Sequence, residues 1–364
     1  MVRSIRLSLF TVTVILICVG VVMIYSASSI YACEKYQDGF FFLKRHLSFL
    51  VIGLVLTLFV MSIDYRKLRR FSKPLLIIAF FLLVLVLIPG VGREVSGARR
   101  WFRFKFLSFQ PSEFVNMAVI IYIADFICRK GNNIKTLVRG FLPPIFILGA
   151  SVLLILLQPD LGTAIALAVV VFSMLFIAGV RLSYLGSLIL AGLPVLYFLI
   201  FSVPYRRMRI MAFFYPWLDP RGSGFQIIQS QVALGSGGIF GVGLGQSRQK
   251  LFYLPAAHTD FIFSIIGEEL GLIGTIGIII LFMIFIHQGF KILKNSSDKF
   301  GYFLGLGLIL IISFKAAVNI GVSCGVLPTK GLPLSFISYG GSSFVFDMIS
   351  VGILLNIART GEYP

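Results

Sequence analysis

Charged residues are scarce in this sequence. Asp, Glu, Lys and Arg make up 13% of its 364 residues, roughly half of the ~25% that is usual in soluble domains. Hydrophobic residues supply 58%, and the mean hydropathy is +0.98. So little polar material cannot cover the surface of a water-soluble globule, which excludes the soluble enzyme and binding-domain classes. We therefore predict an all-α polytopic membrane protein.

Acidic residues are the scarcer of the two signs. The chain has 14 Asp and Glu against 32 Lys and Arg, which gives a formal net charge of +18. In a soluble protein this excess would indicate nucleic acid, but in a membrane protein it is placed at the two membrane faces, near anionic head groups or an anionic substrate. We expect membrane lipids and an anionic substrate as partners, and no nucleic acid.

Cysteines and nucleotide-binding motifs are also few. The four cysteines, at positions 18, 33, 128 and 324, show no Cys-x-x-Cys spacing, so neither a disulfide framework nor a metal cluster is indicated. The glycine-rich residues 235–245 do not spell G-x-G-x-x-G and follow no predicted strand, so a dinucleotide loop is not expected. No internal repeat is visible either.

Long apolar runs dominate what is present. Ten of them approach the ~20 residues that a helix needs to cross a bilayer. They cover residues 7–25, 47–63, 74–88, 114–128, 141–157, 161–180, 185–203, 261–286, 302–324 and 343–357. The first run exceeds the ~7–15 apolar residues of a signal peptide, so it is interpreted as a retained helix. We predict one integral-membrane domain over residues 1–364.

Basic residues in short loops set the orientation of such a chain. Clusters of Lys and Arg follow the second, fourth and eighth runs, which predicts that the N- and C-termini are cytoplasmic. The alternation of ten helices then brings four polar segments together on the outer face. These are residues 90–113, residues 158–160, the long extracytoplasmic loop 204–260 between spans seven and eight, and residues 325–342. Within the long loop, a short helix is predicted over residues 225–234.

Two outer segments carry cations and acids suited to a phosphorylated substrate. GARRW at residues 97–101 supplies Arg99 and Arg100, whose planar donors match phosphate oxygens; anchoring to lipid head groups is the alternative. Glu113 follows Ser112 in FQPSE and Asp160 opens the run that begins at residue 161. Either acid can serve a site. Alternatively, Ser112 caps a helix that has Glu113 in its first turn, and Asp160 itself caps the helix that begins at residue 161.

The sequence His258-Thr259-Asp260 leads directly into the eighth run. An ionisable group at a membrane edge is costly and is by default a functional candidate. Partial desolvation should raise the pKa of Asp260 and make it a better proton acceptor. A histidine such as His258 is more often structural when it stands alone, and Glu268 would lie ~12 Å deeper on a helix, too far to pair with Asp260.

Residues 327–343 are broken by prolines and glycines. Irregular backbone at membrane depth is tolerated only where it is buried in protein or lines a cavity. We predict a substrate cavity lined by Lys330 and by hydroxyl groups, with Thr259, Ser338 and Ser342 as candidate substrate-binding residues. The spacing of Gly267 and Gly271 is interpreted as ordinary helix packing.

Together these motifs resemble the SEDS family (shape, elongation, division and sporulation) of bacterial cell-wall polymerases, which includes FtsW and RodA. The resemblance covers nearly the whole chain, because GARRW, FQPSE, QPDLGT, GLGQSRQKLFYLPAAHTDFIFSIIGEELG, LPTKG and SFISYGGSS occur in this order. The run from QKL to AHTD and the sequence PTKG look closer to FtsW, the division member, than to RodA.

The resemblance implies a peptidoglycan glycosyltransferase of the bacterial cytoplasmic membrane with ten transmembrane helices. It would polymerise lipid II on the outer face, in septal wall synthesis, by an inverting reaction with undecaprenyl-pyrophosphate glycan as the growing product. Asp260 matches the catalytic aspartate, and Arg99, Arg100 and Lys330 would stabilise the leaving pyrophosphate. His258 is a further candidate substrate-binding residue. A divalent cation, Mg²⁺ or Mn²⁺, could be held by Glu113, Asp160 or Asp260. The expected partners are a class B penicillin-binding protein transpeptidase and other divisome proteins.

Four positions depart from the family pattern. Asn116 stands where Lys is frequent, Lys315 where Gln is common, Ala256 where Glu is frequent and Asp347 where Asn is frequent. We hypothesise that Asn116 and Lys315 compensate each other where their helices meet. Two other functions use similar residues: a lipid II flippase, which also needs a basic cavity, and a non-catalytic division scaffold.

Overall fold

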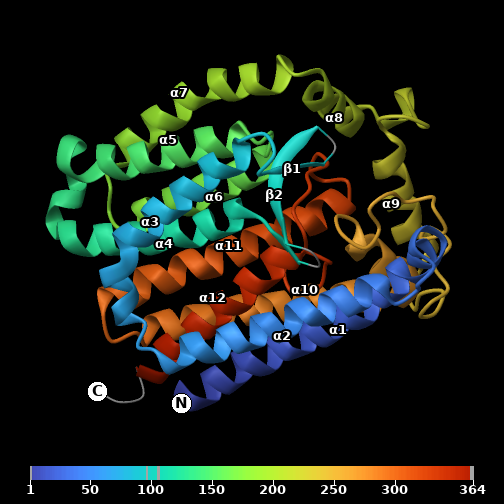
Figure 1. The fold of residues 1–364 in the computed structure, drawn as a ribbon, viewed down its shortest axis with the longest axis horizontal. Helices are drawn as coiled ribbons and strands as arrows, with labels where there is room; N and C mark the ends of the chain where they lie inside the picture. Colours follow the sequence, from blue (N-terminus) through green and yellow to red (C-terminus); the bar gives the residue numbers. More distant parts are fainter. Residues whose placement is uncertain (1, 96, 105–106, 361–364) are drawn as a thin grey trace.

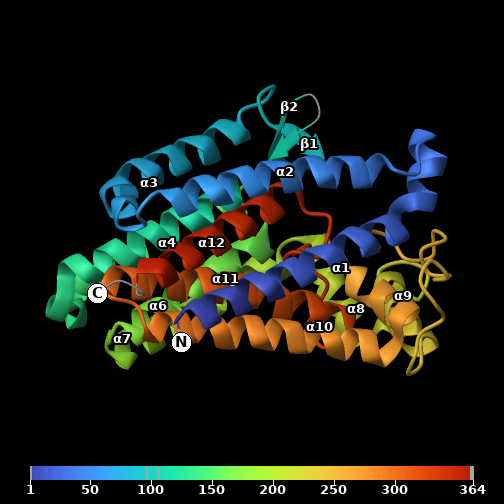
Figure 2. The same ribbon diagram turned by 90° about the horizontal axis from the view of Figure 1, so that it is seen from below.

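The computed structural model describes residues 2–95, 97–104 and 107–360. It is a bundle of long helices, with α1 beginning and α12 ending at the same end of the bundle (Figures 1 and 2). The long helices are α1 (Val2–Tyr36), α2 (Phe41–Ser62), α3 (Arg66–Leu87), α4 (Pro111–Lys130), α5 (Leu142–Leu156), α6 (Leu161–Ile177), α7 (Leu182–Phe201), α10 (Ile262–Lys294), α11 (Lys299–Ser323) and α12 (Gly341–Thr360).

Each of the ten predicted runs corresponds to one of these helices. Within the described residues, nine helices are long and apolar enough to cross a membrane, and the tenth, α6, is shorter. The helices extend beyond the predicted runs: α3 begins at Arg66, eight residues before the run predicted from residue 74. A run predicted from hydropathy ends at the first charged residues. The helix continues through them because backbone hydrogen bonding does not depend on side-chain polarity.

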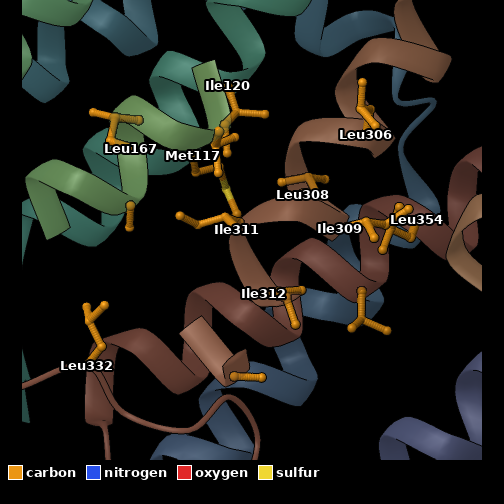
Figure 3. Close-up of a cluster of buried hydrophobic side chains, with 14 of the residues drawn as sticks. Met117, Ile120, Leu167, Leu306, Leu308, Ile309, Ile311, Ile312, Leu332 and Leu354 are labelled. Atoms are coloured by element: carbon orange, nitrogen blue, oxygen red, sulfur yellow. The ribbon is translucent and has the colours of Figure 1, made fainter. Parts of the chain in front are cut away.

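The core lies where α4, α6, α11 and α12 meet. Figure 3 shows Met117 and Ile120 of α4 beside Leu167 of α6, with Ile311 of α11 close to Met117 and Ile309 beside Leu354 of α12. In α4, α11 and α12 most residues are buried all round, whereas α7 keeps one buried residue, Leu185. The central helices are therefore covered by protein, and α7 lies at the periphery, with its apolar side chains available to lipid.

A small antiparallel sheet departs from the all-helical prediction. It consists of β1 (Arg93–Val95), β2 (Ala98–Phe104) and β3 (Leu107–Phe109), in the order β1-β2-β3. In β2, Trp101 lies opposite Arg93, and Phe102 lies opposite Phe109. The aromatic residues of β2 suit a pleated strand, but the stretch is too short to stand out beside the transmembrane signals.

The long loop also contains short helices. These are α8 (Pro204–Phe214), the 3₁₀ turn η3 (Pro216–Leu218) and α9 (Phe225–Ser236); a 3₁₀ turn η1 (Gly131–Lys135) and a π-helical turn η2 (Leu137–Phe141) link α4 to α5. The predicted helix over residues 225–234 is confirmed, with two more residues at its end. Figure 1 shows α8, α9 and the sheet at the end of the bundle away from both termini.

Gly271 breaks α10 rather than serving helix packing alone, so that interpretation was incomplete. Its φ of 67° and ψ of −162° are not helical, and a side chain there would meet the backbone of Ile239 and Gly241. The break frees the carbonyls of Glu268 and Glu269, which accept from the backbone N–H groups of Val242 and Gly243 at 2.9 and 3.1 Å. The glycine-rich loop thus completes the hydrogen bonding of a broken membrane helix.

The side chains of the two glutamates hold the same loop. Glu268 accepts from the backbone N–H of Arg248 at 2.9 Å, and from the hydroxyl of Ser247. Glu269 pairs with Lys250 at 2.9 Å and accepts from Ser26 of α1 at 2.7 Å, with both ionic groups fully buried. The carboxylates are therefore engaged by the chain itself, as expected for structural residues.

Replacing Glu269 with Ala should destabilise the protein strongly, because it leaves the Lys250 ammonium buried without its acid. Breaking one side of a buried pair costs about 3–5 kcal/mol, which thermal unfolding of the detergent-solubilised chain can measure. The matched control is Glu94→Ala, which removes an exposed partner of Arg99 and should cost under about 1 kcal/mol. Equal losses in the two variants would contradict this assignment.

Candidate active site

A cavity of 820 Å³ opens at the end of the bundle that holds the sheet and α8. All four polar segments that the sequence predicted on one face contribute to its lining. α7 adds the apolar Leu196 and Ile200, and the four segments, with the start of α6, supply Gly97, Ala98 and Arg100; residues 159–162; Tyr205, Arg206, Arg209, Ile210 and Asp260; and residues 328–331. The predicted convergence is therefore confirmed as a shared cavity.

Asp260 lies in the wall of this cavity, directly before α10. A tight turn places it there: the backbone N–H groups of Thr259 and Asp260 both donate to the carbonyl of Ala256 at 3.1 Å. Ala256 has a φ of 58°, a left-handed conformation that side-chain-bearing residues adopt mainly where surrounding structure enforces it. Asn319 of α11 holds the turn from below, by donating to the carbonyl of Asp260 at 2.9 Å and to that of Leu332 at 2.9 Å.

The carboxylate of Asp260 accepts no hydrogen bond from any residue that the structure describes. Gly331 lies against it, and a methyl group added there would be in van der Waals contact with the carboxylate oxygens. Burial raises the pKa of this carboxyl from 3.8 to about 6; Arg209 opposes the rise and Asp160 adds to it. A free, partly desolvated carboxylate with this pKa is suited to accept a proton near neutral pH.

Asp160 combines the two roles that the sequence left open. Its carboxylate caps α6 by accepting from the backbone N–H of Thr163 at 3.1 Å and from the Thr163 hydroxyl at 2.9 Å. It also accepts from Gln110 at 3.3 Å, and it lines the cavity. Capping therefore fixes an acid at the cavity wall.

The two adjacent arginines are separated by the structure. Arg100 faces the cavity and donates to the carbonyls of Gln158 and Pro159 at 2.7 and 2.5 Å. Arg99 instead pairs with Glu94 at 3.2 Å and does not line the cavity. Successive residues of a strand point to opposite faces. Without a predicted strand here, the sequence gives no reason to expect Arg99 and Arg100 to point apart.

Lys330 lines the cavity, and burial lowers the pKa of its ammonium group. Apart from Arg100, Asp160 and Lys330, the predicted substrate residues lie outside that lining. The His258 ring packs on Phe42, with centroids 4.5 Å apart, and burial lowers its pKa to about 4. The neutral ring therefore belongs to an aromatic cluster behind the Asp260 turn, although a role in substrate binding stays a prediction.

Three predicted hydroxyls brace the backbone around the cavity. Ser338 donates to the carbonyl of Thr259 at 2.6 Å, and the Thr259 hydroxyl donates to Ala256 at 3.2 Å. Ser342 donates to the carbonyl of Ser108 at 2.9 Å and accepts from the backbone N–H of Gln110 at 3.0 Å. They connect the segments that carry Asp260, β3 and α12.

Glu113 lies deeper, in a buried cluster between α4, α11 and α12. Lys315 donates to it at 2.7 Å, to Ser343 at 2.9 Å and to Asp347 at 3.3 Å. The side-chain amide of Asn116 has no hydrogen-bond partner among the described residues, so it does not bond to Lys315, and the hypothesis that the two residues compensate each other stays a prediction. The departures from the family pattern at 315 and 347 form one ion pair instead.

Capping at Ser112 is not seen, because its buried hydroxyl has no partner among the residues described. Among the outer-loop residues that the sequence analysis did not select, α8 contributes most to the cavity: Tyr205, Arg206 and Arg209 all line it. Arg206 is fixed by donating to the carbonyl of Leu199 at 2.9 Å, while Arg209 is the cation whose charge reaches Asp260. Arg206 and Arg209 are three residues apart, a spacing that would place both side chains on one face of a helix, and this was the signal in the sequence that could have indicated them.

Comparison with known proteins decides the family. The family model FTSW_RODA_SPOVE, described as "Cell cycle protein", matches residues 6–363. The chain belongs to this FtsW/RodA/SpoVE family. It is 46% identical to the stage V sporulation protein E of Bacillus subtilis, over 98% of each chain, and 49% identical to the probable peptidoglycan glycosyltransferase FtsW of Trichlorobacter lovleyi, over 97% and 92%.

Solved structures of family members share the fold. A chain of the structure described as "Structural coordination of polymerization and crosslinking by a peptidoglycan synthase complex" is 30% identical, with a TM-score of 0.81 and 98% of each chain covered. The rod shape determining protein RodA of Thermus thermophilus is 28% identical, with a TM-score of 0.73 and coverage of 98% and 97%. The polytopic helical membrane fold predicted from the sequence is thereby confirmed.

The raised pKa of Asp260 predicts a pH-dependent effect of Asp260→Asn on stability. Between pH 3.8 and about 6 the unfolded chain ionises this group while the folded chain keeps it protonated, so folding stability falls as pH rises and stays lower above pH 6. The amide removes this cost, so thermal unfolding of the variant should occur at a higher temperature at pH 8, with a gain that shrinks toward pH 4.5. An equal shift at both pH values would exclude the ionised carboxylate as its cause.

Proposed function

We propose that this chain is a peptidoglycan glycosyltransferase that polymerises lipid II on the outer face of the bacterial cytoplasmic membrane, with its N- and C-termini in the cytoplasm. The observation that carries the proposal is an unbonded carboxylate, Asp260, sharing one cavity with the cations Arg100, Arg209 and Lys330. Relatives that are 46–49% identical bear the name probable peptidoglycan glycosyltransferase FtsW, which supports this activity.

The cavity offers a place to each part of a lipid-linked sugar donor. A polyprenyl tail can leave along the apolar Leu196 and Ile200 of the peripheral helix α7, and the pyrophosphate can lie among the cations. A sugar hydroxyl then faces the Asp260 carboxylate. No soluble phosphosugar requires the apolar wall, so a membrane-anchored substrate suits the cavity best.

The reaction is a single inverting displacement. Asp260 takes the proton from the 4-hydroxyl of the acceptor GlcNAc as its oxygen bonds to the anomeric carbon of the donor. The bond from that carbon to the pyrophosphate breaks, and polyprenyl pyrophosphate leaves with the electron pair. Arg100, Arg209 and Lys330 stabilise the charge that develops on the leaving group, as fixed cations do at phosphoryl centres.

A divalent cation fits only part of the predicted ligand set. Asp160 and Asp260 share the cavity wall, and carboxylate oxygens are suitable ligands for Mg²⁺ or Mn²⁺. Glu113 is committed to Lys315 outside the cavity, so it leaves the proposed set. Bound between the two aspartates, such an ion would supply further neutralisation of the pyrophosphate charge.

The proposed partner is a class B penicillin-binding protein transpeptidase, together with other divisome proteins. A structurally similar chain forms part of a complex described as coordinating polymerization and crosslinking, which supports a polymerase that works beside a crosslinking enzyme. We also propose a role in septal wall synthesis, which the FtsW name of several relatives supports; the sporulation protein E of Bacillus subtilis is comparably similar.

Loss of the general base should abolish most of the polymerisation of lipid II. With Asp260→Asn, turnover should fall roughly 10²- to 10⁴-fold, measured as glycan chains formed by the purified chain with its transpeptidase partner. In the unsubstituted enzyme, turnover should fall about tenfold per pH unit below pH 6, because protonation at the raised pKa removes the base.

Near-normal glycan synthesis by Asp260→Asn would exclude the base assignment. Transport of lipid II across vesicles without any glycan product would favour the flippase alternative. Absence of both activities, with the partner's crosslinking retained, would favour the scaffold.

Arg209 should contribute to binding of the pyrophosphate. Replacing it with Gln removes a charge-assisted hydrogen bond of about 1.5–3 kcal/mol, so kcat/KM for lipid II should fall roughly 10- to 100-fold. The control is Arg207→Gln, which removes an exposed charge from the same helix outside the cavity lining. A similar loss in the control would indicate general attraction of the substrate by basic residues.

A further inference from the structure

A second pocket lies at the opposite end of the bundle from the proposed active site. It has a volume of 460 Å³ and opens between the start of α3 and the end of α4. Its lining holds five basic side chains, from Arg66, Arg69, Arg70, Lys73 and Arg129, with Ser72 and one acid, Asp125. The proposed polymerisation uses none of them.

The basic residues of α3 repel one another. Residues 66, 69, 70 and 73 are spaced three and four apart, so their side chains share one face of the helix, and like charges at this spacing are destabilising. They also occupy the first two turns, where the helix dipole favours anions, and α3 has no acidic residue in its first turn. Such an arrangement is stable only with negative charge nearby.

The single acid of the pocket is already used. Asp125 is buried and accepts from Arg69 at 3.0 Å, from Arg129 at 2.9 Å and from Ser72 at 2.9 Å. Arg70 and Lys73 have neither a hydrogen bond nor an ion pair with any residue in the ranges that the structure describes. The pocket therefore presents positive charge that the chain does not neutralise.

An apolar lane continues from these cations along α3. Ile77, Phe81 and Val84 follow Lys73 at helical spacing on the same face, and they are 68%, 62% and 50% exposed. Figure 2 shows α3 at the edge of the bundle, beside α4. A free phosphate or an acidic peptide would use the cations alone, whereas a molecule with an anionic head and apolar tails uses both parts.

We propose that the pocket binds the head group of an anionic phospholipid, whose phosphate lies between Arg70 and Lys73 and whose acyl chains lie along the exposed lane of α3. Asp125 of α4 holds the wall of the pocket through its bonds to Arg69 and Arg129. The flexible side chain of Lys73 lets its ammonium group reach the membrane surface. Basic pockets between membrane helices bind such head groups in this way.

The test compares the full chain with Arg70→Gln/Lys73→Gln in detergent, by native mass spectrometry with short-chain phosphatidylglycerol and with phosphatidylcholine. Because neither residue has a partner and both are repelled by neighbouring cations, the double variant should unfold at the same temperature or slightly above it. Each cation near the membrane surface contributes about 1 kcal/mol, so loss of two should weaken phosphatidylglycerol binding roughly thirtyfold. Phosphatidylcholine binding should not change.

The matched control is Lys291→Gln/Lys294→Gln, which removes two basic residues from the last turn of α10 and should keep the preference for phosphatidylglycerol. Equal affinity of the unsubstituted chain and Arg70→Gln/Lys73→Gln would overturn the proposal. Inorganic phosphate or glycerol phosphate binding as tightly as the lipid would indicate a site for soluble anions instead. An acidic peptide that binds more tightly than phosphatidylglycerol would indicate a protein partner.

Discussion

The architecture depends on one constraint: polar backbone that enters a membrane must find its hydrogen-bond partners within the chain. The break at Gly271 would leave carbonyls of α10 unsatisfied, and residues 238–243 fold back to satisfy them. Glu268 and Glu269 then hold the next residues of the same loop. The segment that leads to Asp260 is thus held in place by the requirements of a broken helix, before any substrate is considered.

The sequence predicted the features that depend on local composition. Ten apolar runs became ten helices, residues 225–234 became α9, and the four polar segments met in one cavity, because hydropathy and alternation across a bilayer are properties of consecutive residues. Asp260 was selected for its position at a span edge, and it is the acid without a hydrogen bond in that cavity.

The sequence could not predict features that depend on direction or on distant contacts. Arg99 and Arg100 are neighbours, and only the pleat of β2 sends one to Glu94 and the other into the cavity. Lys315 pairs with Glu113 and with Asp347, 32 residues away, and no local pattern distinguishes these partners from Asn116. Nothing in the sequence distinguishes Arg209 from the other basic residues of the long loop, because the fold of α8 over the cavity is a tertiary feature.

Asn319 joins two walls of the cavity through one amide group, whose two N–H bonds reach the carbonyls of Asp260 and Leu332. Only an amide offers both donors at this length: aspartate would repel both oxygens, and serine has one donor on a shorter stem. Position 319 should therefore tolerate few substitutions. Few substitutions of Asn319 could therefore give resistance to a compound that binds between these two walls.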